Sequence, residues 1–311
     1  MKIYLNKSKT LAEKEALAKQ VSFDDRGPEF IPAETTEPVN IYIPDHTKVT
    51  VFPDIHFPAA HTPCLQAVLR FNGRFQPDIL DFDGDILDGY VMSRYSKKPG
   101  VATAFTLECA QARNYIQDSV KASGAAFTFW KKGNHDERPD SFINENVQPL
   151  AFQTDRNGNP ILHFFNLVGL DSQSKSKTVL IKQGALINDR LWAHHGHLVK
   201  SNPGETPFFL ANLLGMGSEN GHTHRAGEQI RFTTSGEELE AYEHGFIARS
   251  AHPQLGYVTE DRKNWQLSFA TKYFLFGRPY TTIRPIIPLL DDDNIERLGF
   301  RYGNKIEYCY E

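Results

Sequence analysis

The sequence has few cysteines, no long hydrophobic run and little net charge. Its three cysteines stand far apart among 311 residues, which excludes a disulfide-rich scaffold and predicts reduced thiols in a cytoplasmic protein. No stretch of about 18 apolar residues occurs, so we expect no membrane-spanning helix, and the first residues lack the apolar core of a secretory signal. The formal net charge of −4 gives no overall attraction to nucleic acid or anionic lipid, so only a local basic patch stays open.

The composition is that of a folded globular chain. Hydrophobic residues make up 40% and charged residues 23%, which excludes disordered, collagen-like and coiled-coil classes. Short apolar runs that end in polar residues alternate with stretches of helical periodicity. The runs cover residues 48–54, 77–85, 125–136 and 189–197, and the helical stretches cover 61–75 and 103–123. This alternation predicts an α/β fold with functional sites just beyond the carboxyl ends of strands.

Changes in composition predict three parts of the chain. Residues 1–45 form a predicted N-terminal extension, with a short amphipathic helix and a linker rich in proline, glutamate and threonine. Residues 46–277 form the predicted main domain. Residues 278–311 are expected to form a C-terminal tail, of one or two strands and a loop, that packs on this domain.

Five short strings carry the candidate functional residues. In chain order they are PDIHFP (53–58), FDGDILD (82–88), KGNHDER (132–138), AHHGH (193–197) and NGHTHR (220–225). Each has an ordinary explanation by itself, because Asp, Asn and His are common in solvated loops, turns and helix caps. Together they offer more carboxylate and imidazole groups than one mononuclear site uses. We therefore expect two metal ions, about 3.5–4 Å apart, that share a carboxylate.

The order D-x-H, G-D-x-x-D, G-N-H-D, H-G-H and G-H-x-H resembles the calcineurin-like metallophosphoesterase superfamily, over about residues 48–224. The phrases D-x-H-F-P, GNHDER and GHTHR also resemble phage-encoded members. The resemblance implies a four-layer αββα sandwich with two facing mixed β-sheets. It further implies a phosphoesterase in which a hydroxide that bridges two metal ions attacks the phosphate ester.

The resemblance also implies a ligand set for two divalent metal ions. Asp85 would bridge both ions. The ligands of the first ion would be Asp54, His56 and His224, and those of the second Asn134, His195 and His222. His195 is preferred to its neighbours because the family ligand directly precedes a glycine. Manganese is the first choice of metal, with iron, zinc and nickel as alternatives.

Two further residues are expected to act without binding metal. His135 would contact the phosphate and protonate the leaving oxygen, as the resemblance implies. Asp88 would hold one ring nitrogen of His135, because a carboxylate there fixes the tautomer and leaves the other nitrogen facing the substrate. The alternative for Asp88 is a cap on the following segment.

The sequence departs from serine/threonine protein phosphatases, in which an arginine that clamps the phosphate follows the G-D-x-x-D string. Here Gly89 stands in that position. Arg94, Arg138 and Arg225 lie near motifs and are candidate replacements, with a plain surface role as the alternative for each. The missing arginine favours phosphodiesters, whose single negative charge needs less neutralisation.

These observations predict a dinuclear metal-dependent phosphoesterase that hydrolyses a phosphate ester, with a preference for phosphodiesters such as a nucleotide or nucleic acid. A phosphomonoesterase acting on a small molecule or a protein is the alternative. A non-catalytic binding scaffold is a third hypothesis. The lysines near residues 97 and 131 could form a basic rim for nucleic acid or a solvated surface. The oligomeric state stays open.

Overall fold

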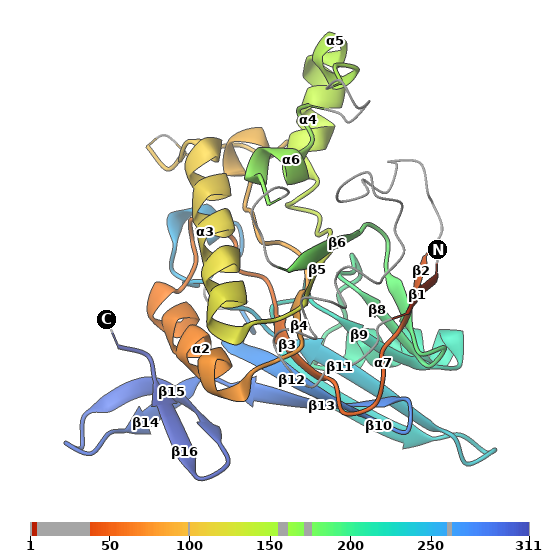
Figure 1. The fold of residues 1–311 in the computed structure, drawn as a ribbon. Coiled ribbons are helices and arrows are strands. Elements are labelled where there is room, and N and C mark those ends of the chain that lie inside the picture. Colours follow the sequence, from red (N-terminus) through yellow and green to blue (C-terminus); the bar gives the residue numbers. More distant parts are fainter. Residues whose placement is uncertain are drawn as a thin grey trace.

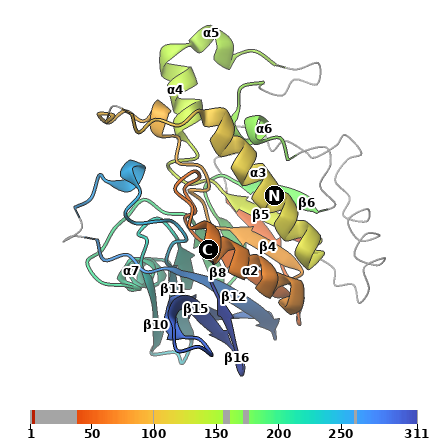
Figure 2. The ribbon, with the colours of Figure 1, turned by 90° about the vertical axis from the view of Figure 1, so that its left-hand side faces the viewer.

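Two mixed β-sheets lie face to face, with helices on their outer sides (Figure 1 and Figure 2). The structure is a computed structural model, and it describes residues 2–4, 38–98, 100–154, 161–170, 176–259 and 263–310. This arrangement confirms the α/β class and the four-layer sandwich that the sequence predicts.

The six-stranded sheet contains three of the four predicted apolar runs. Its order is β13-β12-β3-β4-β5-β6, and strands β3 to β6 are parallel to one another. The strands span Lys48–Phe52 (β3), Ile79–Phe82 (β4), Phe127–Lys131 (β5), Lys177–Ile181 (β6), Ser268–Leu275 (β12) and Arg278–Pro285 (β13). The carboxyl ends of the parallel strands therefore share one edge of the sheet.

The seven-stranded sheet has the order β1-β2-β7-β8-β9-β11-β10. Its strands span Lys2–Tyr4 (β1), Val39–Tyr42 (β2), Ala185–Ile187 (β7), Leu191–His194 (β8), Gly217–Asn220 (β9), Ala226–Phe232 (β10) and Glu238–His244 (β11). Strand β8 holds the fourth apolar run and is parallel to β9.

One hydrophobic core lies between the sheets, and another lies beneath the helices. Alternate residues such as Val49 and Val51 of β3 face the inner side and pack with Ile41 and Ala193 of the other sheet. On the outer side of the six-stranded sheet, α2 (Thr62–Phe75) and α3 (Phe105–Ser123) bury a stripe at helical spacing. Both helices were predicted from that periodicity.

The remaining helices are shorter. Helix α7 (Glu205–Leu214) contacts β9, β10 and β11 and covers the outer side of the seven-stranded sheet. Helices α4 (Arg138–Asn146), α5 (Gln148–Ala151) and α6 (Phe164–Val168) and the single turns η1 (Tyr90–Met92) and η2 (Pro253–Leu255) complete the set. Figure 1 shows α4 and α5 projecting from the top of the molecule. Among the described helices, none combines the length and apolar character needed to cross a bilayer.

The two ends of the chain differ in how much is described. The amphipathic helix and most of the linker predicted within residues 1–45 lie outside the described residues, whereas β1 and β2 join the seven-stranded sheet. At the other end, β13 pairs with β12, and β14 (Ile287–Leu290), β15 (Glu296–Tyr302) and β16 (Lys305–Tyr308) form a small antiparallel sheet. This sheet contacts α2, where Phe300 packs against Phe71. The domain limits stay predictions.

Candidate metal centre

Each of the five sequence strings lies at the carboxyl end of a strand that has at least one parallel neighbour. Asp54, Asp85 and His135 come directly after β3, β4 and β5 of the six-stranded sheet, while His195 and His222 come after β8 and β9 of the other sheet. The two sheets thus present these side chains at a common edge. Ligand sites in such folds lie just beyond the carboxyl ends of parallel strands.

Two glycines are needed because the loops approach one another closely. A Cβ on Gly133 would lie 2.1 Å from Asp85 Oδ1, and a Cβ on Gly84 would lie 2.3 Å from His195 Nδ1. Neither space can hold a methyl group without moving a side chain of the site. The glycines of the G-D and G-N-H strings therefore set how tightly the histidines and carboxylates assemble.

Four of the predicted ligands have a left-handed backbone. The φ angles are 52° for His56, 49° for Asp85, 68° for His222 and 59° for His224. Residues other than glycine seldom adopt positive φ, and such conformations gather at functional sites. The backbone of these loops is bent to direct the side chains inward.

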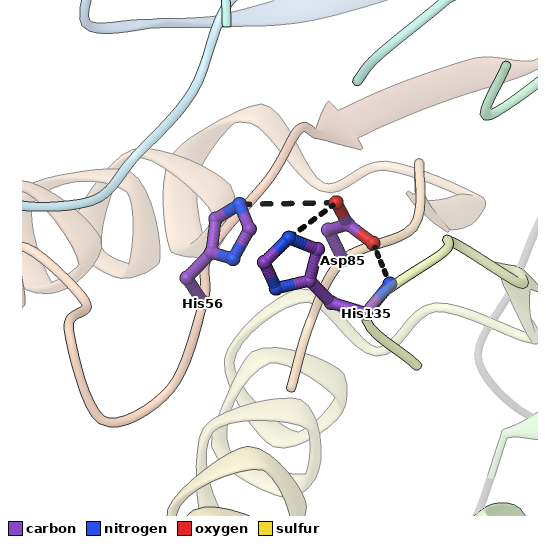
Figure 3. Close-up of side chains that lie close together, drawn as sticks. All are labelled: His56, Asp85 and His135. Carbon is purple, nitrogen blue, oxygen red and sulfur yellow. Dashed lines mark hydrogen bonds and ion pairs between the residues drawn. The ribbon is translucent and has the colours of Figure 1, made fainter. Parts of the chain in front are cut away.

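The carboxylate of Asp85 faces the rings of His56 and His135 (Figure 3). Its Oδ2 is 3.2 Å from His195 Nε2, 3.9 Å from His56 Nε2 and 4.0 Å from His135 Nε2. Its Oδ1 accepts a hydrogen bond of 2.8 Å from the backbone N–H of His135. One buried carboxylate thus faces histidines from both sheets.

Asp54, His56 and His224 meet on one side of Asp85. The Nε2 atoms of the two histidines are 2.9 Å apart, and Asp54 Oδ2 lies 3.5 Å from His224 Nε2. Neither oxygen of Asp54 has a well-formed hydrogen bond among the described residues, although the side chain is fully buried. A buried carboxylate without well-formed hydrogen bonds is costly, so this site is well suited to a cation.

Two groups of three side chains have the spacing of metal ligands. They are His56, Asp85 and His135, and Asp85, His195 and His222, with their ligand atoms within 4.8 Å of one another. Asp85 belongs to both groups. Asn134 is exposed and lines a neighbouring cavity.

His135 is held by groups on both of its ring nitrogens. Asp88 Oδ1 is 2.9 Å from Nδ1, and the Asp88 carbonyl oxygen is 3.1 Å from the same atom. Arg138 Nη2 donates to Nε2 at 3.0 Å, and Arg138 Nη1 donates to the Asp88 carbonyl oxygen at 2.7 Å. Both nitrogens of His135 are thereby engaged.

A buried glutamate binds the backbone next to Asp88. Glu108, on α3, accepts a hydrogen bond of 2.8 Å from the Gly89 N–H. The peptide group between Asp88 and Gly89 is therefore held at its carbonyl by His135 and Arg138 and at its N–H by Glu108. Burial raises the pKa of Glu108 to about 8, and the neighbouring Asp88 adds to this.

Burial and neighbouring charges shift the pKa values of the cluster in different directions. Burial lowers the pKa of His222 to about 4 and that of His224 well below its usual range, so both imidazoles are neutral at neutral pH. Burial also raises the pKa of Asp54 well above normal. Burial would lower the pKa of His195 too, but the field of Asp85 outweighs it and raises that pKa to about 10. A cation beside the carboxylates would reverse the shift of Asp54.

Of the three candidate arginines, the structure brings only Arg138 to the cluster. Arg94 pairs with Glu145 and is largely exposed. Arg225 donates to the carbonyl oxygen of Lys200. Among the histidines beside His195, His194 is buried and His197 is exposed.

Sequence reasoning missed a buried charge network behind the cluster. Lys131 Nζ lies 2.9 Å from Asp81 Oδ2 and 2.7 Å from Asp83 Oδ1, and Lys272 Nζ lies 3.3 Å from the same oxygen of Asp81. His244, to which the sequence assigns no role, lies 2.6 Å from Asp83 Oδ2 through its Nδ1.

This network reaches the cluster through Asp83. Its backbone oxygen lies 2.7 Å from His195 Nδ1, which orients the ring so that Nε2 faces Asp85. Glu219 of β9 completes the network by pairing with Lys272. The available sequence signal was a charged residue inside an apolar strand, as in FTFWK or SFATKYFL, because such residues are rarely buried unless paired.

Comparison with known proteins gives few matches by sequence. No family model matches the chain. The Gene 54 protein of Mycobacterium phage D29 is 24% identical over 186 residues, which cover 58% of this chain and 70% of that protein.

Several solved structures are similar in fold. A dimetal phosphatase from Danio rerio is 10% identical with a TM-score of 0.39, covering 78% of this chain and 97% of its own. A point mutant of Vps29 from Entamoeba histolytica is 15% identical with a TM-score of 0.37, covering 82% and 100%. The nuclease MPE of Pseudomonas putida is 10% identical with a TM-score of 0.30, covering 75% and 86%. Because these scores are low, what the chain does has to be inferred from its own site.

Proposed function

We propose that this chain is a dinuclear metal-dependent phosphoesterase of the calcineurin-like metallophosphoesterase superfamily. The observation that supports this most is the position of Asp85, a buried carboxylate common to two groups of potential metal ligands. A single carboxylate with two oxygens can bind two ions at once, which is the requirement of a dinuclear site.

Two ions would be held on either side of Asp85. Asp54, His56 and His224 would hold the first, and His195 and His222, with Asn134 from the neighbouring loop, would hold the second. The residues fit divalent cations because Asp54 is buried without well-formed hydrogen bonds in the described part of the chain and because His56, His222 and His224 are neutral. His195, whose pKa Asp85 raises, would release its proton when an ion binds. When bound, such ions supply a water nucleophile of lowered pKa and positive charge that stabilises the phosphoryl oxygens.

His135 would act as the acid that protonates the leaving oxygen. Asp88 accepts from Nδ1, which directs Nε2 away from the carboxylate and makes it the nitrogen that transfers the proton. Arg138 Nη2 donates to this Nε2 at 3.0 Å, so Nε2 can carry the transferred proton only when Arg138 donates to an oxygen of the phosphate instead. The engagement of both ring nitrogens favours this role over direct metal binding.

The proposed substrate is a phosphodiester. Asp54 and Asp85 carry two negative charges against four from two divalent ions, so the loaded site would stay cationic and attract a phosphate ester despite the acidic chain. Arg138 is the only one of the three candidate arginines that lies beside His135. One guanidinium group suits the single negative charge of a diester, but a monoester would use the same group. A phosphomonoesterase therefore remains the second candidate. A cytoplasmic location is part of the proposal and rests on the sequence alone.

Hydrolysis of bis-p-nitrophenyl phosphate and p-nitrophenyl phosphate with added manganese tests the proposal. We expect turnover of the diester by the purified chain, abolished by chelation and restored by manganese. The variant His135→Ala should retain its bound manganese and lose about 100-fold or more in kcat. A chain that hydrolyses neither ester with any of manganese, iron, zinc or nickel would instead favour the binding-scaffold hypothesis.

A further inference from the structure

A cavity of about 730 Å³ is lined by residues on both sides of His135 in the sequence, although His135 itself is not part of the lining. It lies between the segment that carries η1 and helix α4. On the side of the metal centre it is lined by Asn134 and Arg138, which flank His135 in the sequence, and on the outer side by Met92, Tyr95 and Phe142. Its volume is within the range of small-molecule sites, which is roughly 300–1,000 Å³.

The charges that line this cavity cancel. Arg94 and Arg138 are matched by Glu137 and Glu145, and Arg94 is paired directly with Glu145 across the cavity from the η1 segment to α4. Binding of a nucleic-acid strand requires cations that are free to contact successive phosphates. The described lining has no such excess, so it suits a neutral group better than a second phosphate.

Two aromatic rings line the cavity while remaining open to solvent. The exposed fraction is 80% for Tyr95 and 40% for Phe142. Large rings are usually buried, and aromatic rings that stay accessible at a cavity are surfaces on which another flat ring can stack. Tyr95 projects from the segment after η1 and Phe142 from α4, so they approach the cavity from two different elements.

We propose that this cavity binds the leaving group of the substrate, and that this group is a neutral alcohol bearing a flat ring, such as a nucleoside. The inference rests on the proposed function, because it takes His135 as the acid. In the reaction, a water oxygen bonds to phosphorus while the bond from phosphorus to the leaving oxygen breaks. Once Arg138 has turned from Nε2 to an oxygen of the phosphate, a His135 that is protonated on both ring nitrogens passes its Nε2 proton to the leaving oxygen. The residues on both sides of His135 direct the released alcohol into the cavity.

The test compares two methyl phosphodiesters that share a deoxyribose 5′-oxygen as leaving atom. One carries thymine on the sugar and the other has no base. We expect the thymidine diester to be cleaved to thymidine and methyl phosphate, with kcat/KM at least about 10-fold above that of the abasic diester, because stacking contributes about 1–3 kcal/mol per base.

Variants separate stacking from other effects. Tyr95→Ala and Phe142→Ala should lower the ratio of kcat/KM between the thymidine diester and the abasic diester towards one, whereas Tyr95→Phe should keep that ratio. Tyr280→Ala is the matched control, since Tyr280 is 49% exposed on β13 and does not line this cavity. If the wild type cleaves both diesters equally, or if Tyr95→Ala slows both equally, the inference is overturned.

Failure of the proposed function would appear differently. It would be seen as an absence of turnover even on bis-p-nitrophenyl phosphate. In that case equilibrium dialysis with thymidine and with deoxyribose decides on the ligand. Binding of thymidine that is lost in Tyr95→Ala and kept in Tyr280→Ala would support the cavity as a site for a flat neutral ligand. Equal retention of thymidine by the wild type and Tyr95→Ala would refute it.

Discussion

The carboxylate of Asp88 lies 2.9 Å from Nδ1 of His135, and the backbone oxygen of the same aspartate lies 3.1 Å from that nitrogen. A single residue thus fixes both the tautomer and the orientation of the histidine. Because Asp88 is buried and His135 nearly so, the ring has little freedom to turn. The side chain is positioned before any substrate arrives.

We expect Asp88→Asn to lower kcat on a diester by about 10- to 100-fold, the effect usual for loss of the carboxylate behind a functional histidine. Asp88 Oδ1 also lies 3.3 Å from Nδ1 of His56, a proposed ligand, so turnover is compared at saturating manganese, where both proposed sites are filled. Steady-state kinetics measures the turnover, and elemental analysis measures the bound manganese. Asp118→Asn, at an exposed position of α3, is the control. Unchanged turnover in Asp88→Asn would remove its orienting role.

Loss of the shared carboxylate should affect both metal positions together. In Asp85→Asn we expect manganese bound at equilibrium to fall from two ions per chain to fewer than one. The loss in affinity should exceed the roughly 10- to 100-fold typical of an outer partner. Titration with manganese followed by calorimetry gives the number of sites. A variant that still binds two ions with wild-type affinity would contradict the dinuclear arrangement.

The buried network predicts a large loss of stability in Lys131→Met. The substitution leaves Asp81 and Asp83 buried without the ammonium group that contacts both, and breaking a buried ion pair costs about 3–5 kcal/mol. Urea unfolding measures the difference. Lys121→Met, at an exposed position near the end of α3, should stay within about 0.5 kcal/mol of the wild type. Equal stability of the two variants would argue against the network.

Glu108 predicts a specific dependence of stability on pH. Its pKa is raised to about 8 in the folded chain from roughly 4.3 when unfolded. Between these values the folded state binds more protons, so the free energy of unfolding falls as pH rises through this window. Glu108→Gln cannot ionise, and we expect it to be more stable than the wild type at pH 8 by roughly 1–3 kcal/mol.

Unfolding in urea at pH 5 and pH 8 compares the slopes. The variant should show the flatter dependence, while Glu296→Gln, exposed on β15, should follow the wild type. Parallel curves for Glu108→Gln and the wild type would show that burial leaves this carboxyl ionised as usual.

Much of the fold could be predicted because its signals are local. Apolar runs that end in Asp, Asn or His located β3, β4, β5 and β8, and helical periodicity located α2 and α3. The same runs placed the five strings at the carboxyl ends of strands. Because the two sheets face each other with these ends at a common edge, Asp85 and His195 come close together. The assignment of the metal ligands stays a prediction.

What the sequence could not reveal depends on partners far apart in the chain. Lys272 meets Asp81 across 191 positions, and a single lysine in an apolar strand does not say which carboxylate it will contact. Likewise, Arg94, Arg138 and Arg225 all lie near motifs. Of the three, only Arg138 contacts His135, because it is the first residue of α4. The parallel pairing of β1 with β2 has the same origin, since it joins segments 38 residues apart in register, Lys2 to Asn40.

The positive φ angles of His56, Asp85, His222 and His224 mean that the chain gives up conformational energy where its chemistry is concentrated. A left-handed residue other than glycine costs on the order of 1 kcal/mol, and at each of these positions glycine would relieve that cost while removing a side chain of the cluster. Glycine at these positions would therefore exchange the cluster itself for a small relief of backbone strain. Engineers seeking a hardier form of this protein should leave them untouched and look for gains elsewhere.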